Sequence, residues 1–391
     1  MSNSTDIVYL DYAASTPADP RVIEAMTPHF GADGDFANPS SGHIAGRRSG
    51  AHVERATGQL AELLGCREEE LVWTSGATES DNLAIVGAAR YRADRGRHLV
   101  TMPTEHKAVA DVFRVLEKQG FGVSWLRPDD TGVLDPASLE AAIRPDTQLV
   151  SIMHVNNETG VIQDIEALGA VCRERDVLFH VDAAQSVGKL PLELASLPVD
   201  LLSTTAHKVY GPKGIGALYI ADRPGCHVEP LIHGGGQQGG QRPGTLAVPL
   251  IAGFGEAARI ALSEMQENRE HLRSLRDRLW RGIRDLDGII RNGTESHTFP
   301  GILNVSIEDI EGESLLLALE PLCVATGSAC NSKSQEPSSV LRALGRSDLL
   351  AQSAIRFSFG RPTTSDEVDF AAARYREAIG RLRGIAPGHA A

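Results

Sequence analysis

The stretch Ser203-Thr204-Thr205-Ala206-His207-Lys208 is the most informative part of this chain. It follows the apolar run Pro198-Val199-Asp200-Leu201-Leu202, an order typical of a buried strand that ends in polar residues. A lysine in that place can form a Schiff base with an aldehyde, while the hydroxyls and the imidazole can hold a phosphate. A single lysine at a strand end is more often a solvated charge, so this interpretation needs support from elsewhere in the chain.

Two other segments supply that support. Asp182 closes the apolar run Val177-Leu178-Phe179-His180-Val181, and Ser75-Gly76-Ala77-Thr78-Glu79-Ser80 lies between a strand-like run and a helix-like run. A glycine-containing turn into a helix directs backbone N–H groups at an anion. Each feature alone has an ordinary explanation as a turn or a helix cap. Together, an acid, a lysine and a phosphate turn indicate pyridoxal 5'-phosphate (PLP): the acid would pair with its pyridine nitrogen and the lysine would carry its aldehyde.

Helix-like and strand-like runs alternate from about residue 40 to residue 262. This alternation predicts an α/β fold with a mainly parallel sheet covered by helices on both faces, which binds ligands at the carboxyl ends of its strands. A long amphipathic helix near residues 264–286 leads into a smaller α+β unit. We therefore expect a large PLP-binding domain over residues 16–262, and a small domain formed by residues 1–15 and 263–391.

Composition narrows the class of protein. The chain has 391 residues, of which 42% are hydrophobic and 23% charged, as in ordinary globular proteins. The net charge of −13 disfavours direct contact with nucleic acid or anionic membranes. No segment has the pattern of a signal peptide or a membrane span. The five cysteines are widely spaced and odd in number, which favours a reducing cytoplasm over a disulfide framework or a metal site.

Longer motifs connect these features to a known family. They are Thr104-Glu105-His106-Lys107, His154-Val155-Asn156-Asn157-Glu158, Asp182-Ala183-Ala184-Gln185-Ser186, His207-Lys208 and Gly327-Ser328-Ala329-Cys330. With them, the chain strongly resembles the PLP-dependent cysteine desulfurases, from Tyr9-Leu10-Asp11-Tyr12 to about Arg383. It is most similar to the housekeeping bacterial form that feeds iron–sulfur cluster assembly. The resemblance implies a fold-type I enzyme with a seven-stranded type of sheet, acting as a homodimer.

The resemblance also implies roles for individual residues. Lys208 would hold the PLP aldehyde, Asp182 would keep the pyridine nitrogen protonated, and His106 would stack on the ring. Gln185 would donate a hydrogen bond to the phenolic oxygen, and Thr245 would reach the phosphate from the other subunit of the homodimer. The remaining cofactor contacts are expected from Ala77, Thr78, Asn157, Thr205 and His207. Thr205 stands where the family often has serine, and it keeps the hydroxyl.

Other residues are expected to bind the substrate or to attack it. The resemblance assigns substrate contacts to Asn38, Asn157 and Arg356, with Arg356 binding the carboxylate through a bidentate pair. Cys330 lies in a small, polar run from residue 326 to residue 334, with Lys333 nearby to favour the thiolate. A cysteine that must reach the cofactor and then deliver sulfur elsewhere needs such a loop.

The expected reaction converts L-cysteine to L-alanine. Lys208 would remove the α-proton, with His106 as acid–base partner. The thiolate of Cys330 would attack the substrate sulfur and retain it as a persulfide. Its acceptor would be a protein of iron–sulfur assembly, tRNA thiolation or DNA phosphorothioation. Two alternatives remain from the residues alone: a selenocysteine lyase or another PLP enzyme on this scaffold, and, more remotely, a non-catalytic scaffold.

Two places depart from the family pattern. The glycine-rich run has Gln237-Gln238 where an acid is common at the second position, and Pro243 replaces a usual serine, which removes a backbone donor. Related chains also continue with a tail that helps to dock the cluster scaffold protein, and weaker scaffold binding is therefore expected here.

Overall fold

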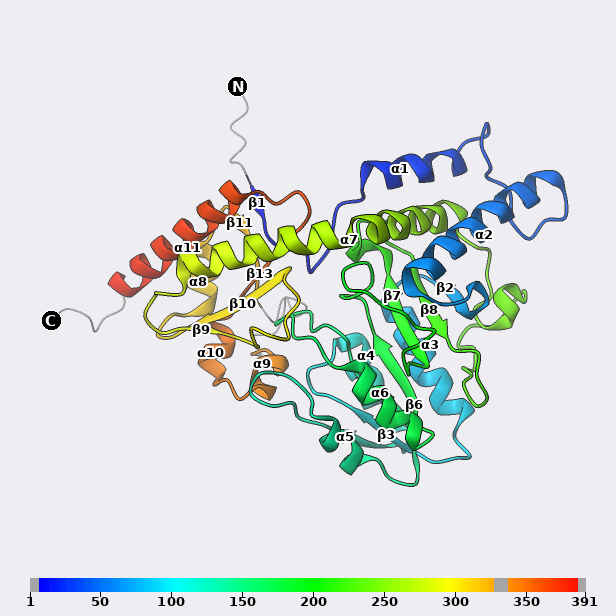
Figure 1. The fold of residues 1–391 in the computed structure, drawn as a ribbon, viewed down its shortest axis with the longest axis horizontal. Helices are drawn as coiled ribbons and strands as arrows, with labels where there is room; N and C mark the ends of the chain where they lie inside the picture. The colour runs from blue at the N-terminus through cyan, green and yellow to red at the C-terminus, as the bar shows by residue number, and fades with distance from the viewer. Residues whose placement is uncertain (1–6, 327–336, 386–391) are drawn as a thin grey trace.

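A seven-stranded sheet forms the centre of the larger part of the protein (Figure 1). The computed structural model describes residues 7–326 and 337–385. The strand β8 runs antiparallel to its two neighbours, and every other neighbouring pair is parallel, so the expectation of a mainly parallel sheet is confirmed. The strands in spatial order are β2 (Leu71–Thr74), β8 (Gly216–Ile220), β7 (Leu201–Thr205), β6 (Leu178–Asp182), β5 (Thr147–Ser151), β3 (His98–Thr101) and β4 (Gly122–Trp125).

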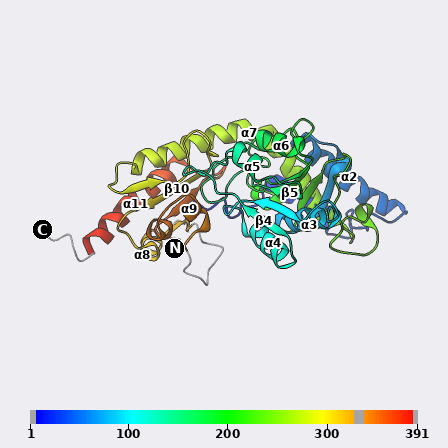
Figure 2. The ribbon, with the colours of Figure 1, turned by 90° about the horizontal axis from the view of Figure 1, so that it is seen from below.

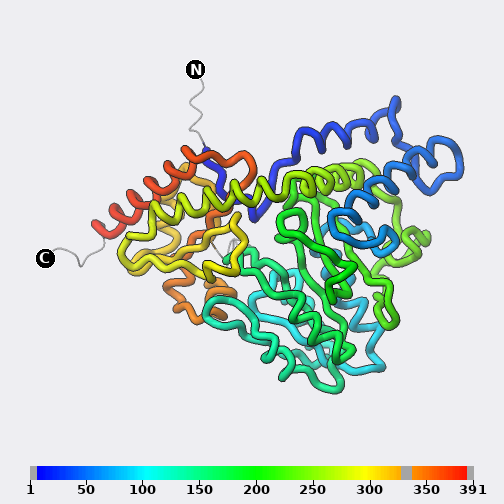
Figure 3. The backbone as a smooth tube through the Cα atoms, in the orientation of Figure 1, coloured from blue at the N-terminus to red at the C-terminus, as the bar shows by residue number. Residues whose placement is uncertain are grey.

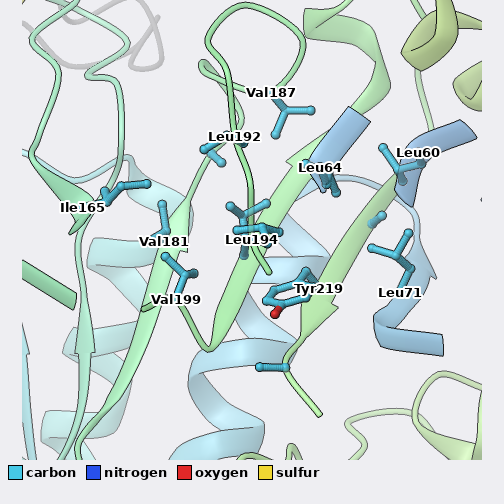
Figure 4. Packing of buried hydrophobic residues seen from close by; sticks show 14 of the residues in the cluster. Leu60, Leu64, Leu71, Ile165, Val181, Val187, Leu192, Leu194, Val199 and Tyr219 are labelled. Carbon is cyan, nitrogen blue, oxygen red and sulfur yellow. The ribbon is translucent and has the colours of Figure 1, made fainter. Parts of the chain in front are cut away.

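Helices cover both faces of this sheet, because successive strand side chains alternate between the faces. Leu178 packs with side chains of α3 (Ala77–Tyr91) and α4 (Lys107–Lys118). The adjacent Phe179 and Val181 join the opposite cluster. Figure 4 shows part of that opposite cluster. The helices that contribute side chains to this opposite cluster are α2 (Ile44–Leu64), α5 (Pro136–Ala142), α6 (Ile165–Glu174) and the first half of α7 (Val248–Ile283).

The helix α7 is 36 residues long and runs along both parts of the protein (Figure 1). We expected a long helix only from about residue 264, and the structure corrects this. Pro249 stands in the first turn, where proline needs no hydrogen-bond partner for its nitrogen. The following turns are buried against the larger sheet through Ile251 and Phe254, so they lack the one-sided apolar pattern of an exposed helix.

A smaller antiparallel sheet lies beside the second half of α7 (Figure 2). The buried rings of Phe357 and Tyr375 meet edge to face in its core. The strands in order are β12 (Ala325–Thr326), β13 (Ile355–Ser358), β10 (Ile302–Ile307) and β9 (Ile289–Arg291). A separate parallel pair joins β1 (Val8–Tyr9) and β11 (Leu322–Cys323), and the helices are α8 (Gly312–Ala318), α9 (Ser339–Ala343), α10 (Asp348–Gln352) and α11 (Ser365–Ile385).

The N-terminal segment connects the two parts, as the blue trace of Figure 3 shows. The amide of Leu10 donates to the carbonyl of Cys323 in the smaller part. The amide of Thr16 donates to the carbonyl of His207 in the larger part. The chain then enters α1 (Pro20–Met26) and the short helical turn η1 (Thr27–His29). The domain boundaries expected at residues 15/16 and 262/263 stay predictions.

Candidate active site

A cavity of about 700 Å³, called here the cofactor cavity, lies at the carboxyl ends of the parallel strands. Its lining includes the last residues of β6 and β7, Asp182 and Thr205, and the turn that follows β2. It also includes His106 after β3 and Lys208 after β7. Parallel strands place their carboxyl ends at one sheet edge, and this explains how separate segments meet here. The cavity lining further contains Ala77, Thr78, Asn157, Gln185, His207 and Arg356.

Asp182 is buried at the end of β6, where its Oδ1 accepts a hydrogen bond from the amide of Ala184 at 2.9 Å. Burial raises the pKa of Asp182, although the Ala184 amide, His106 and Lys208 act in the opposite direction. A protonated ring nitrogen placed beside this carboxyl group would supply a cation that favours its ionised form. The environment therefore suits an acid that pairs with a heterocyclic nitrogen.

Lys208 lies in the short helical turn η3 (Ala206–Lys208) directly after β7. Its Nζ donates hydrogen bonds to the backbone carbonyls of Ala13 and Ala14, the latter at 2.8 Å. These carbonyls belong to the N-terminal segment, which the sequence did not connect with the site. They hold the amine at the wall of the cofactor cavity without neutralising it.

The turn between β2 and α3 offers an anion site. Gly76 is the N-cap residue of α3, and no side chain caps this helix. Its φ of 154° is a conformation that residues with a Cβ rarely adopt. Gly216 must also lack a Cβ, which would lie 2.6 Å from the Cα of Gly76. The first backbone N–H groups of α3 thus remain available to an anion, and the helix dipole adds positive potential.

Three further polar side chains line the cofactor cavity: His207, Thr205 and His106. Burial and the nearby Lys208 and Lys213 lower the pKa of His207 to about 4, so its ring is neutral at pH 7. Thr205 donates its hydroxyl hydrogen to the carbonyl of Ile215 at 3.2 Å, so donating to a phosphate requires its hydroxyl to rotate. His106 accepts a hydrogen bond at Nδ1 from the amide of Ala108 at 3.1 Å, which places the proton of the neutral ring on Nε2.

Arg356 reaches the cavity from β13 of the smaller sheet. Its Nη2 donates to Oδ1 of Asp11 at 2.6 Å, and its Nη1 donates to the carbonyl of Asn157 at 2.7 Å. Nε is buried and has no hydrogen-bond partner among the described residues. An incoming carboxylate therefore finds a cation already oriented, with a donor still to satisfy. Asp11 is a site residue that sequence reasoning missed.

Asp81 was also missed, although it lies only three residues after Thr78. It is fully buried on α3 and lines the cofactor cavity, and Nε2 of the buried His180 lies 3.6 Å from its Oδ1. Burial, and next the charge of Asp182, hold the pKa of Asp81 well above its usual range. The helical spacing from Thr78 is a signal that could have found it, because residues three apart share a helix face.

Three expected residues are not brought to the cavity by the described chain. Thr245 is exposed and does not line the cofactor cavity. Asn38 is also exposed, and its Oδ1 accepts a hydrogen bond from the amide of Ser40 at 2.9 Å. Cys330 lies outside the described residues. Thr326, the last described residue before that gap, lines the cofactor cavity.

The two departures from the family pattern have a clear local structure. Gln238 accepts a hydrogen bond at Oε1 from the amide of Trp73 at 2.6 Å and donates from Nε2 to the carbonyl of Trp73 at 2.9 Å. Arg242, beside Pro243, forms an ion pair with Glu79 of α3, with Nε and Oε1 2.7 Å apart. Gln238 and Arg242 thereby attach this segment to β2 and α3, on both sides of the turn that joins them.

The residues present fit PLP. The cavity combines an amine at a strand end, a buried carboxyl group and an uncapped helix N-terminus, which match the aldehyde, the ring nitrogen and the phosphate of that cofactor. Among the described residues there is no group of His, Cys, Asp and Glu able to hold a metal ion. Within the same part of the chain, none of the helices is both long and apolar enough to cross a membrane.

Comparisons with known proteins agree with this architecture. The family model described as aminotransferase class-V matches residues 8–370. The chain is 55% identical over 381 residues to "Cysteine desulfurase IscS" of Serratia proteamaculans, and 54% identical over 381 residues to the protein of that name from Escherichia coli. Each alignment covers 97% of this chain and 94% of the relative.

Solved structures give the same picture. A structure named "NIFS-LIKE PROTEIN" has a TM-score of 0.89 at 37% identity and covers 96% of this chain and 100% of its own. A second, "SspA in complex with cysteine", has a TM-score of 0.79 at 40% identity and covers 90% and 98%. The chain belongs to the aminotransferase class-V family, whose members of this kind are PLP-dependent enzymes of fold-type I. Within that family it belongs to the cysteine desulfurases of the IscS type.

Proposed function

We propose that this chain binds PLP in the cofactor cavity and uses it to move sulfur from L-cysteine to Cys330. The observation that carries the proposal is the convergence of Lys208, Asp182 and the uncapped N-terminus of α3 on one cavity. Lys208 would hold the aldehyde after its amine leaves the carbonyls of Ala13 and Ala14. Asp182 would pair with the ring nitrogen, and His106 would stack on the ring.

The phosphate of PLP would lie against the turn between β2 and α3. Backbone N–H groups of Ala77 and Thr78 would donate to it, together with the ring of His207 and the hydroxyl of Thr205. Thr245 of a second copy of the chain would complete this contact. In one copy Thr245 and Asn38 are exposed and away from the cavity, which supports a homodimer in which each copy completes the site of the other.

The substrate carboxylate would bind Arg356 and Asn157. The free Nε of Arg356 and the existing bond from Nη1 to the carbonyl of Asn157 support this placement. When bound, PLP supplies an electron sink for the charge left on the α-carbon. Lys208 would take up the α-proton, and the Nε2–H of His106 would exchange a proton with the substrate.

Sulfur transfer would then involve Cys330. Its thiolate would attack the substrate sulfur, so that the carbon–sulfur bond breaks and a sulfur–sulfur bond forms. L-cysteine and the Cys330 thiol thus yield L-alanine and a persulfide on Cys330. An acceptor protein would take the sulfur: a cluster scaffold, a tRNA thiolase or a phosphorothioation protein. Offering each of these to the persulfide form, and following the label from ³⁵S-cysteine, identifies which one accepts it.

Substitution of Lys208 tests the proposal. Lys208→Ala should lose the visible absorbance of bound PLP and all formation of alanine from cysteine. Lys118→Ala, an exposed lysine at the end of α4, is the matched control and should keep both. A Lys208→Ala protein with wild-type absorbance and turnover would exclude the assignment.

A further inference from the structure

Ala13, Gln185 and Lys208 form a wall of the cofactor cavity that has a second cavity behind it. These residues line both the cofactor cavity and an adjoining cavity of about 50 Å³. Lys189 lines only the adjoining cavity, so it lies on the far side of this wall. Its Nζ also lies 5.6 Å from the centre of the Phe299 ring. None of the roles assigned above uses this lysine.

Two hydrogen bonds hold the Gln185 amide in one orientation. Nζ of Lys189 donates to Oε1 of Gln185 at 2.9 Å, and Nε2 of Gln185 donates to the carbonyl of Ala13 at 2.7 Å. A lysine ammonium can only donate and a backbone carbonyl can only accept. A flipped amide would place its N–H₂ group against the ammonium and its oxygen against the carbonyl. Lys189 and the Ala13 carbonyl therefore favour the same orientation of the amide. In that orientation Nε2 is the donor of the Gln185 side chain.

We propose that Lys189 is a positioning residue that holds the Gln185 amide so that its second N–H donates to the phenolic oxygen of PLP. The proposal rests on the function proposed above, because it assumes PLP in the cofactor cavity. Nε2 has two hydrogens, and the carbonyl of Ala13 accepts one of them. The other remains for a ligand atom, and Gln185 lines the cavity where that ligand would lie.

Loss of the lysine would disturb this arrangement in a defined way. Gln185 is buried, so Oε1 without its donor would be an unsatisfied buried acceptor. Rotation of the amide would instead bring Oε1 against the carbonyl of Ala13 and the phenolic oxygen, which are both acceptors. The loss of Lys189 thus predicts weaker PLP binding and a changed electronic environment at the ring oxygen.

The charge of Lys189 is part of the same arrangement with Gln185. Burial, and next the charges of Lys208 and Arg356, lower the pKa of Lys189 to about 7. Arginine keeps both the charge and the donor at every working pH, so Lys189→Arg is the conservative variant. Lys189→Met keeps much of the length of the side chain and removes both.

The test measures the cofactor itself rather than turnover. PLP is titrated into apoprotein prepared from wild type, Lys189→Met, Lys189→Arg and the surface control Lys118→Met. Absorbance spectra of the bound cofactor are recorded from pH 6 to pH 9. Lys189→Met should raise the PLP dissociation constant roughly tenfold and shift the pH midpoint of the visible band. Lys189→Arg should restore most of the affinity, and Lys118→Met should match wild type.

A double-variant cycle separates positioning from general damage. In a Gln185→Leu background there is no amide to orient, so adding Lys189→Met should weaken PLP binding less than twofold. A full tenfold effect in that background would overturn the proposal, because Lys189 would then act independently of Gln185. Unchanged affinity and spectrum in the single Lys189→Met variant would overturn it equally. Failure of the wild-type protein to bind PLP at all would instead refute the proposed function.

Discussion

Nη2 of Arg356 lies 2.6 Å from Oδ1 of Asp11, a residue 345 positions away in the sequence. The side chain of Arg356 is 7% exposed, and that of Asp11 is 22% exposed. The pair joins the N-terminal segment to β13 beside the cofactor cavity. The same guanidinium is the expected partner of the substrate carboxylate, so stability and substrate binding depend on one cation.

Asp11→Asn should therefore destabilise the protein. It removes the anion beside a buried guanidinium, and the cost should be about 2 kcal/mol of unfolding free energy. Urea unfolding measures this loss. The control is Asp369→Asn, which breaks the exposed pair with Arg278 and should cost much less unfolding free energy, because solvent screens exposed pairs. Equal effects of the two changes would contradict the importance given to the buried pair.

Glu158 should make stability depend on pH. Burial raises the pKa of Glu158 to about 7, against the charges of Arg356 and His106 and the hydroxyl of Ser338, which donates to Oε2 at 2.5 Å. The unfolded chain would have the ordinary glutamate pKa of about 4.3. Between these two values the folded protein binds more protons, so the unfolding free energy falls as pH rises from about 4.3 to about 7.

Glu158→Gln should remove that dependence. The difference in unfolding free energy between pH 5 and pH 8 should shrink by about 2 kcal/mol relative to wild type. Denaturant unfolding at the two pH values gives both numbers, and other titrating groups cancel in the comparison. An unchanged difference would show that Glu158 titrates at its ordinary pKa in the folded protein.

Cys330→Ser should bind PLP and L-cysteine with wild-type affinity yet form no persulfide. The reason is that serine keeps the size of the side chain and lacks the nucleophilic sulfur. Alkylation of the persulfide followed by mass spectrometry measures the product. Cys172→Ala, which changes a buried thiol of α6, should still form it. Persulfide on Cys330→Ser at the wild-type rate would place the nucleophile elsewhere.

Mixed dimers should show whether Thr245 contacts the cofactor bound to the other copy of the chain. A Lys208→Ala chain and a Thr245→Ala chain, refolded together, should yield some heterodimers with one unaltered site. PLP affinity in that fraction should exceed the affinity of either parent dimer, by roughly tenfold over Thr245→Ala for one recovered phosphate contact. Separately tagged chains allow the heterodimer to be purified before titration. A mixed dimer no better than Thr245→Ala would show that Thr245 acts within its own chain.

Much of the site was predictable because its chemistry follows strand ends. Asp182 and Thr205 end their strands, and an apolar run followed by a polar residue is a local signal. Asp11 and Lys189 carried no such signal. Asp11 reaches the site because the N-terminal segment crosses between the two sheets, and Lys189 because a turn folds it behind Gln185. These are tertiary relationships, which no periodicity along the chain encodes.

The start of α7 was missed for a related reason. Its first turns are buried against the larger sheet, and a helix buried on several sides has no polar face to mark its period. The one-sided pattern appears only where the helix continues past that sheet, with Leu272, Leu275 and Leu279 facing the smaller one. The sequence thus predicted the half of the helix that is buried on one side only, and not the half that is buried on several sides.

The hydrogen bonds of Gln238 have a consequence for self-association. β2 is the outermost strand at its end of the larger sheet, and an outermost strand offers unpaired backbone groups to other chains. The side-chain amide of Gln238 pairs with both backbone groups of Trp73, as an added strand would do. A carboxylate there could accept from the Trp73 amide but could not donate to its carbonyl. Gln238 therefore occupies the two backbone groups of Trp73 with which a strand of another chain could otherwise pair.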